Sequence, residues 1–461
     1  MSVTPVWAQF VDLAVAICFV LALKGLSGPK TARNGNLLGA AGATVAVVTL
    51  FFAHPHMKNL PLILGAIVVG VAIGFPAARK VKMTQMPQLV ALFNGVGGGA
   101  AALVSIIEYL SAGTSESKAI LAATVFTVVV GSVSFSGSIL TFLKLQEAIT
   151  TRPIVLPGGR FITSFIALAT LVAAAGLVVA PALWLLIVLI VLSVMFGLLL
   201  VLPVGGADVP IVISLLNAFT GLSVAASGYV LGNVLLIVAG TLVGASGTLL
   251  TKEMAKAMGR PLTKTMFGAF TATAAVAGVG SGEERPVRSG TPQDVAIMLG
   301  YANKVIIVPG YGLAVAQAQH TIRELVDLLG EKGIPAAYAI HPVAGRMPGH
   351  MNVLLAEANV PYDQLKEMDE INPEFASTDV VMVVGANDVV NPAAKSDPTA
   401  PIYGMPILDV SSAAQVVFLK RSMRPGFAGI ENELLYDPKT TLLFGDAKDS
   451  LTKVVAAVKA L

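Results

Sequence analysis

Long runs of apolar residues fill roughly the first 250 positions of the chain, separated by short polar segments. Each run is close to the ~20 residues that a helix needs to cross the hydrocarbon core of a bilayer. The first run contains Asp12 and is too long for a removable signal sequence, so we count it as a span. The pattern predicts a transmembrane domain of about nine helices, at approximately 5–24, 36–54, 60–78, 85–109, 119–143, 161–179, 182–203, 208–227 and 229–250.

Short apolar runs alternate with helical patterns from about residue 291 onward. Thr291, Pro292 and Asp294 are typical of a helix start, because Thr caps, Pro suits the first helical position and Asp favours the N-terminal end. Strands that alternate with helices predict an α/β, Rossmann-like domain with a doubly wound parallel sheet. The expected strands are 305–308, 336–340, 379–384, 406–410, 415–419 and 441–444, and the expected helices include 313–329, 350–359 and 447–460.

Glycine and other small residues dominate the segment of about 262–290, which has no sustained hydrophobic period. This composition is typical of a hinge or flexible linker. The predicted organisation is therefore a transmembrane domain at 1–261, a linker at 262–290 and a Rossmann-like domain at 291–461.

The composition supports a membrane protein and excludes several other classes. Hydrophobic residues make up 55% of the chain and charged residues 12%, against about a quarter charged in soluble domains. A net charge of +3, dispersed in short clusters, argues against nucleic acid. Cys18 is the single cysteine, which excludes an intrachain disulfide. The five histidines lack zinc-type spacing, so no metal site is predicted.

Positive charges alternate between the loops and predict the orientation in the membrane. The richer loops hold Lys24, Lys30, Arg33, Arg79, Lys80, Lys82, Lys144, Arg152, Arg160, Lys252, Lys256, Arg260 and Lys264. The intervening loops hold little more than Lys58 and Lys118. Because Lys and Arg accumulate on the cytoplasmic side, we expect the N-terminus outside and the C-terminal domain in the cytoplasm.

A glycine turn, Gly310-x-Gly312-x-x-Val315, follows the first expected strand and opens a helix. This context is typical of dinucleotide binding: the first glycine permits the turn, and the second lets the backbone approach a pyrophosphate. The third position is Val315 rather than glycine. A tight turn between strand and helix without a ligand is the alternative interpretation.

Residues at the ends of other strands favour NADP(H) over NAD(H). An acidic residue that would hold a ribose hydroxyl is missing from 341–350, which follow the second expected strand. Lys420, Arg421 and Ser422 close another strand with donors suited to an additional phosphate, although such a triplet can also be a solvated surface cluster. Segments 385–388 and 445–447 end two further strands and are candidate cofactor contacts, while Asp388 could equally cap the following turn.

Longer segments carry a resemblance to a known family. Residues 341–358, 367–372 and 385–388 resemble the beta subunit of proton-translocating NAD(P) transhydrogenase, and 86–91, 205–208, 214–217 and 242–247 extend the similarity through the membrane part. The resemblance implies that hydride passes between NAD(H) and NADP(H), coupled to inward proton movement across a bacterial cytoplasmic membrane. It implies NADP(H) on this chain, NAD(H) on a partner alpha subunit with further membrane helices, and two copies of the assembly.

The resemblance also implies a set of cofactor contacts on this chain. Two of them belong to a lid at 424–429, in which Phe427 replaces a Tyr found in some relatives. The implied contacts are Gly310, Tyr311, Gly312, Leu313, Ala314, Val315, Val343, Ala344, Gly345, Arg346, Met347, Gly385, Ala386, Asn387, Asp388, Lys420, Arg421, Ser422, Gly426, Phe427, Asp446 and Ala447.

Asn94 and Asn217 are polar residues inside predicted spans, where such groups tend to mark pathways. The resemblance places at Asn94 a histidine that acts as a proton relay in many relatives, and asparagine cannot titrate. We therefore hypothesise that a partner membrane subunit supplies a histidine and that both asparagines line a hydrated path. Alternatively, they only join helices by hydrogen bonds. Asp388 is our candidate sensor that links protonation to nucleotide state.

A second function class fits part of the same pattern. A transporter or channel gated by a nucleotide-sensing cytoplasmic domain would also bind NADP(H). The two classes differ because hydride transfer requires a second nicotinamide domain, and this sequence contains only one glycine turn of the expected kind.

Overall fold

The computed structural model divides into two compact units. One comprises Met1–Val81, Gln88–Val204 and Val212–Thr251, and the other Lys82–Pro87, Gly205–Ile211 and Lys252–Leu461. The residues described are 5–53, 59–82, 85–112, 117–150, 153–154, 156–205, 208–257, 285–345, 349–398, 400, 402–426 and 428–461. Of the predicted linker, 262–284 lies outside them.

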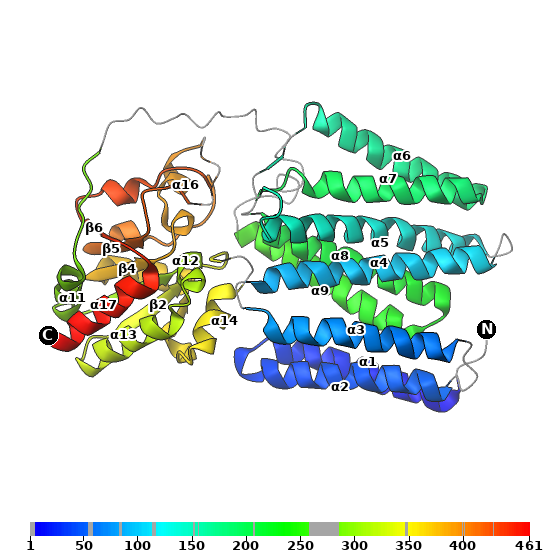
Figure 1. Cartoon of the computed structure of the whole chain (residues 1–461), viewed down its shortest axis with the longest axis horizontal. Helices are drawn as coiled ribbons and strands as arrows, with labels where there is room; N and C mark the ends of the chain where they lie inside the picture. The colour runs from blue at the N-terminus through cyan, green and yellow to red at the C-terminus, as the bar shows by residue number, and fades with distance from the viewer. Residues whose placement is uncertain are drawn as a thin grey trace. The chain divides into compact units, whose positions relative to one another are not determined.

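Long apolar helices form the first unit (Figure 1). Within the described ranges nine helices are long and apolar enough to span a membrane, which confirms the predicted number. The last one continues several residues past its predicted end, because Lys252, Glu253 and Lys256 extend the helix beyond the apolar run. The helices are α1 (Val6–Leu26), α2 (Pro29–Ala53), α3 (Leu60–Lys80), α4 (Met86–Ala112), α5 (Lys118–Leu145), α6 (Gly159–Val179), α7 (Leu183–Val201), α8 (Val209–Leu231) and α9 (Val234–Ala257).

Several buried hydroxyl groups on these helices bond to their own backbone. Thr127 donates to the Ala123 carbonyl at 2.9 Å, Thr141 to Gly137 at 2.8 Å, and Ser193 to Leu189 at 2.7 Å. A bilayer core offers no water as a partner, so a polar group there must be satisfied within the protein. These bonds let small polar residues lie inside the unit without breaking the helices.

Glycine brings α8 and α9 into backbone contact. A Cβ added to Gly221 would lie 2.4 Å from the Gly244 nitrogen, and one added to Gly240 would lie 2.4 Å from the Ala225 nitrogen. Apolar side chains gain little by leaving lipid, so close packing through small residues is what holds such helices together.

A six-stranded parallel sheet forms the centre of the second unit, as the sequence predicts. Its order is β3-β2-β1-β4-β5-β6, so the chain reverses direction across the sheet between β1 and β4. Val305 of β1 pairs with Ala336 of β2 on one side and with Val380 of β4 on the other. The strands are β1 (Val305–Pro309), β2 (Ala336–Ile340), β3 (Leu365–Glu367), β4 (Val380–Val384), β5 (Gln415–Lys420) and β6 (Thr440–Phe444).

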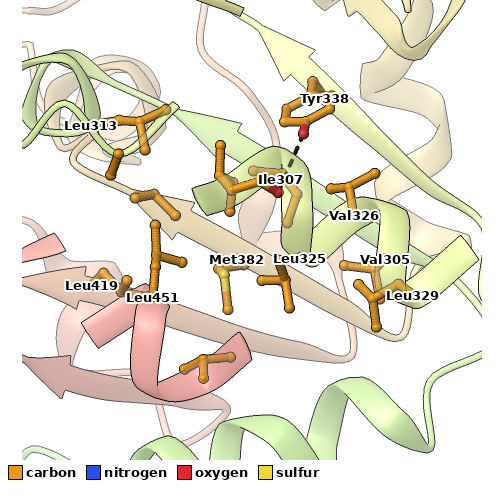
Figure 2. Packing of buried hydrophobic residues seen from close by; sticks show 14 of the residues in the cluster. Val305, Ile307, Leu313, Leu325, Val326, Leu329, Tyr338, Met382, Leu419 and Leu451 are labelled. Carbon is orange, nitrogen blue, oxygen red and sulfur yellow. Dashed lines mark hydrogen bonds between the residues drawn. The ribbon is translucent and has the colours of Figure 1, made fainter. Parts of the chain in front are cut away.

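Alternate residues of each strand pack against different helical layers. Val305 and Ile307 face the layer that holds α11, α13 and α17, whereas Ile306 and Val308 face the short helices of the other layer. Figure 2 shows the first of these layers, in which the Tyr338 hydroxyl donates to the Ile322 carbonyl at 3.4 Å. The helices are α11 (Pro292–Gly300), α12 (Tyr311–Val315), α13 (Gln319–Glu331), α14 (His350–Glu357), α15 (Met368–Ile371), α16 (Ala393–Ser396) and α17 (Ala447–Ala460), with η4 (Tyr362–Gln364), η5 (Asn372–Ser377), η6 (Asp388–Val390), η7 (Val410–Ser412) and η8 (Glu433–Tyr436).

The start of this layered domain follows the predicted signals. The Thr291 side chain accepts from the Asp294 N–H, and the Asp294 carboxylate accepts from the Thr291 N–H, which together form a capping box ahead of α11. Just before it, Gly290 N–H donates to the Leu442 carbonyl, and Leu442 N–H donates to Arg288. The end of the predicted linker therefore lies against β6.

The expected helix at 313–329 is wrong as a single element. It consists of α12 and α13, separated at Gln317, whose φ is +51°. This left-handed residue lets the Ala318 N–H return to the Leu313 carbonyl at 3.2 Å, a helix-ending arrangement. The chain therefore turns directly after its first helical turn.

The expected strand at 406–410 is also wrong, and the short strand β3 was not expected. Both sides of β4 are already paired, with β1 and β5, so the apolar segment lies on a face of the sheet. Asn372 takes the place of a neighbouring strand: its Nδ2 donates to the Ile407 carbonyl at 3.1 Å, and its Oδ1 accepts from the Asp409 N–H at 3.1 Å.

His341 follows β2 directly and is 1% exposed. Its Nε2 lies 2.8 Å from the Pro406 carbonyl oxygen, and the Val343 N–H donates to Nδ1 at 3.2 Å. These contacts fit the neutral ring with its proton on Nε2. Burial lowers the pKa of His341 from 6.5 to about 4, against the opposing effect of the Pro406 hydrogen bond.

We expect His341 to make the domain less stable as the pH falls from 7 to 5. The imidazole of the unfolded chain takes up a proton near pH 6.5, whereas that of the folded domain does so only near pH 4. Lowering the pH from 7 to 5 therefore reduces the free energy of unfolding by about 2 kcal/mol. Hydrogen exchange of the β2 amides in the full-length protein, corrected for intrinsic rates, measures the loss. His341→Asn keeps an acceptor near Val343 without titrating and should flatten this slope; an unchanged slope would contradict a buried neutral His341.

Candidate functional site

The site lies where the chain reverses direction across the sheet. After β1 the chain enters α12 on one face, and after β4 it enters η6 on the other. In doubly wound sheets this divergence opens a crevice at the carboxyl ends of the strands. The glycine turn and segment 385–388 form the two sides of that crevice.

Three glycines allow these two turns to touch. The Gly310 N–H donates to the Val384 carbonyl and the Gly312 N–H to the Gly385 carbonyl, both at 2.9 Å. A Cβ on Gly310 would lie 2.4 Å from the Ala386 backbone, and one on Gly312 would lie 2.7 Å from the Gly385 Cα. Gly385 has a φ of +69°, which disfavours any side chain. Protein packing alone therefore requires glycine at 310 and 312, in addition to any role toward a pyrophosphate.

A cavity of about 640 Å³ occupies this crevice, within the usual range for cofactor sites. Most of the residues expected to contact the cofactor line it. They are Gly310, Tyr311, Gly312, Val315, Val343, Ala344, Gly345, Gly385, Ala386, Asn387, Asp388, Lys420, Arg421, Ser422, Gly426, Asp446 and Ala447. Segments far apart in sequence thus meet at the ends of β1, β4, β5 and β6.

The remaining expected contacts differ in position. Leu313 and Ala314 are buried in the hydrophobic layer around α13, so their side chains support the turn rather than line the cavity. Arg346, Met347 and Phe427 lie outside the described residues. Ile402 and Met405 also line the cavity and were not expected there, because they lie in an irregular segment that has no motif.

A hydrogen-bond network connects β4, β5 and the segment after β5. The Asn387 Nδ2 donates to Asp388 Oδ1 at 3.0 Å, and Lys420 Nζ donates to Asn387 Oδ1 at 3.2 Å. Asp388 Oδ2 accepts from the Ala428 N–H at 2.8 Å. Burial lowers the pKa of Lys420, and the nearby Asp388 carboxylate opposes this shift. The network places one cation and one carboxylate at the cavity wall.

Other charged and polar groups at the wall differ in how they are held. Arg421 and Ser422 are exposed after β5, which leaves them accessible to a ligand. Asp446 instead caps α17, because its carboxylate accepts from the Lys448 N–H at 2.9 Å. The wall therefore combines exposed donors with structurally fixed groups.

The cationic groups among the described residues of the cavity wall lie at or just after the end of β5 rather than after β2. Among the described residues that line the cavity after β2, none carries a carboxylate. The first residue after β2 is His341, which is buried and lies against the Pro406 carbonyl. Lys420, Arg421 and Ser422 instead supply cationic and neutral donors at the end of β5.

The two candidate membrane residues lie in the first unit. Asn94 on α4 donates to Ser138 at 2.9 Å and to Ser134 at 3.4 Å, both on α5. Ser134 donates to the Leu216 carbonyl on α8 at 2.9 Å and lies 2.6 Å from the Thr220 hydroxyl. This cluster joins three helices. Asn217 follows Leu216 on α8, partly buried, outside the cluster.

Comparisons with known proteins agree with this architecture. Residues 8–457 match the family described as NAD(P) transhydrogenase beta subunit. The chain is 46% identical over 454 residues to NAD(P) transhydrogenase subunit beta of Rhodospirillum rubrum, covering 97% of this chain and 98% of that protein. A protein of the same name from a designated strain of Rhodospirillum rubrum gives the same values. The chain therefore belongs to the family of NAD(P) transhydrogenase beta subunits.

Proposed function

We propose that this chain binds NADP(H) in the cavity at the ends of β1, β4, β5 and β6. The observation that carries the proposal is the pair of strand ends: buried His341 after β2, and Lys420, Arg421 and Ser422 after β5. The residues after β5 can neutralise the negative charge of a 2′-phosphate and donate hydrogen bonds to it. The residues that would hold the nucleotide are those that line the cavity.

The reaction needs a second nucleotide site. A transhydrogenase beta subunit works with an alpha subunit in hydride transfer between NAD(H) and NADP(H), coupled to proton movement. We assign the NAD(H) domain and additional membrane helices to that partner, with two copies of the assembly. Bound NADP(H) would carry the hydride, and this chain would orient the nucleotide in the crevice where the chain reverses direction across the sheet.

The arrangement in the membrane follows from the charges of the loops. Alternate loops rich in Lys and Arg support an external N-terminus and a cytoplasmic nucleotide domain. In this arrangement, residues 1–261 carry the proton path, 262–290 link the parts and 291–461 bind the nucleotide.

Replacing Arg421 tests the choice of nucleotide. We expect Arg421→Ala to weaken NADPH binding by roughly ten- to a hundredfold, because a charge-assisted phosphate bond is lost. The affinity for NADH, which lacks that phosphate, should stay unchanged. Titration calorimetry with both nucleotides measures this, with Lys453→Ala on the exposed face of α17 as the control. Equal losses for NADPH and NADH would contradict a contact with the 2′-phosphate.

Replacing Asp388 tests its role as a sensor. The carboxylate accepts two hydrogen bonds, from Asn387 and Ala428, and an amide has only one oxygen with which to accept them. We expect Asp388→Asn to speed NADP(H) release and to weaken its coupling to proton movement, as followed by stopped-flow displacement and by proton pumping in vesicles. Asp409→Asn, which removes a surface partner of Lys395, is the control. Release and proton coupling like those of the wild type would refute the sensor.

The proton path requires a titratable group that Asn94 cannot supply. Asn94 is held by Ser138 and Ser134, and we assign the proton carrier to a membrane histidine of the alpha subunit. Changing that histidine to alanine in the co-expressed complex should abolish proton pumping in vesicles while NADPH binding persists. Undiminished pumping would eliminate the shared site.

A further inference from the structure

Lys144 is buried in the last turn of α5 with 1% of its surface exposed. Its expected place among the loop charges is wrong, because Lys144 lies in the last turn of α5 and is buried. Its Nζ donates to the carbonyl oxygens of Val201, Leu202 and Val204 at 3.1, 2.6 and 2.9 Å. An ammonium group has three donors and no acceptor, so these three oxygens satisfy its charged form.

Two of these carbonyls, those of Val201 and Leu202, lie at the C-terminal end of α7, and that of Val204 lies just beyond it. That helix ends at Val201, with Leu202 as its C-cap. The last carbonyls of a helix lack partners within it and carry partial negative charge. Lys144 also lies in the last turn of its own helix, so one cation lies at the negative ends of both α5 and α7.

The same carbonyls belong to the corner that precedes α8. The Ile154 N–H also donates to the Leu202 carbonyl, and the Val204 N–H donates to Val201, each at 3.1 Å. These bonds make residues 201–204 a compact corner at the end of α7.

Helix α5 holds α8 at a second point. Ser134 donates to the Leu216 carbonyl and contacts Thr220, and it also accepts from Asn94. Ser134 and Lys144 are ten residues apart on one helix, about 15 Å along its axis. One contact therefore fixes the corner before α8, and the other fixes α8 beside Asn94.

A buried lysine is costly in a membrane protein, where such residues tend to mark functional places. A neutral side chain of similar length would cap fewer carbonyls and would place no charge at the helix ends. We propose that Lys144 is a positioning residue for proton translocation: its ammonium group locks the corner at 201–204 onto α5, and together with Ser134 of the same helix it keeps α8 in register beside Asn94 of α4.

The proposal predicts a loss confined to the proton step. In complexes with the alpha subunit reconstituted into vesicles, Lys144→Met should slow proton pumping on the order of tenfold or more, because charge-assisted hydrogen bonds to buried carbonyls are lost. NADPH affinity and single-turnover hydride transfer between bound nucleotides should remain near wild type. Lys118→Met, at the exposed start of α5, is the matched control and should pump normally.

Conservative variants separate positioning from general stability. Lys144→Arg keeps a charged donor and should retain pumping, whereas Lys144→Gln keeps a neutral donor and should lose it. If the complex with Lys144→Met does not assemble, the comparison of Lys144→Arg with Lys144→Gln tests the proposal. Normal pumping by Lys144→Met or Lys144→Gln would overturn the proposal. It would also be overturned if pumping, NADPH affinity and single-turnover transfer fell together, because that result would indicate a lysine needed only for folding.

Discussion

The contact between the turns after β1 and β4 is the constraint on which the nucleotide domain depends. The two central strands pair from Val305 with Val380 to Pro309 with Val384, after which their chains leave toward opposite faces. The backbones at Gly310 and Gly385 touch at this point, at distances that leave no room for a Cβ. The crevice can open only beyond this contact, so the turn determines where strand-end residues converge.

The bilayer imposes a different constraint on the first unit. A polar group there must find a partner within the protein, and some buried hydroxyls of α5, such as Thr141, do so on their own backbone. Asn94, Ser134 and Lys144 are different because they bond to groups outside their own helix. Their hydrogen bonds therefore specify how helices are placed relative to one another, which apolar packing alone specifies weakly.

The hydrophobic periodicity of the sequence predicted the helices and strands that bury an apolar surface. It failed where backbone hydrogen bonds determine whether an apolar segment forms a strand. The nine spans and β1, β2, β4, β5 and β6 were evident from their apolar runs. Residues 406–410 have the same apolar character, but the Asn372 side chain and the Val389 carbonyl bond to their backbone instead of a neighbouring strand. Strand ends likewise indicated Lys420 and Asp388, whereas nothing local indicated Met405, which reaches the cavity through tertiary folding. The capping of α7 by Lys144 was equally hidden, because its acceptors are backbone atoms far along the chain.

The network around Asn387 gives a physical route from nucleotide to protein in the proposed binding mode. Lys420 is bonded to Asn387 at 3.2 Å and to the Arg424 carbonyl at 3.3 Å, longer than strong charge-assisted bonds of about 2.8 Å. A phosphate would therefore be a better partner for this ammonium group than its present acceptors. A phosphate that drew Lys420 away from Asn387 would free the Asn387 amide to reorient against Asp388. Because the same carboxylate accepts from the Ala428 N–H, such a change would reach the segment beyond β5 through three side chains, Lys420, Asn387 and Asp388.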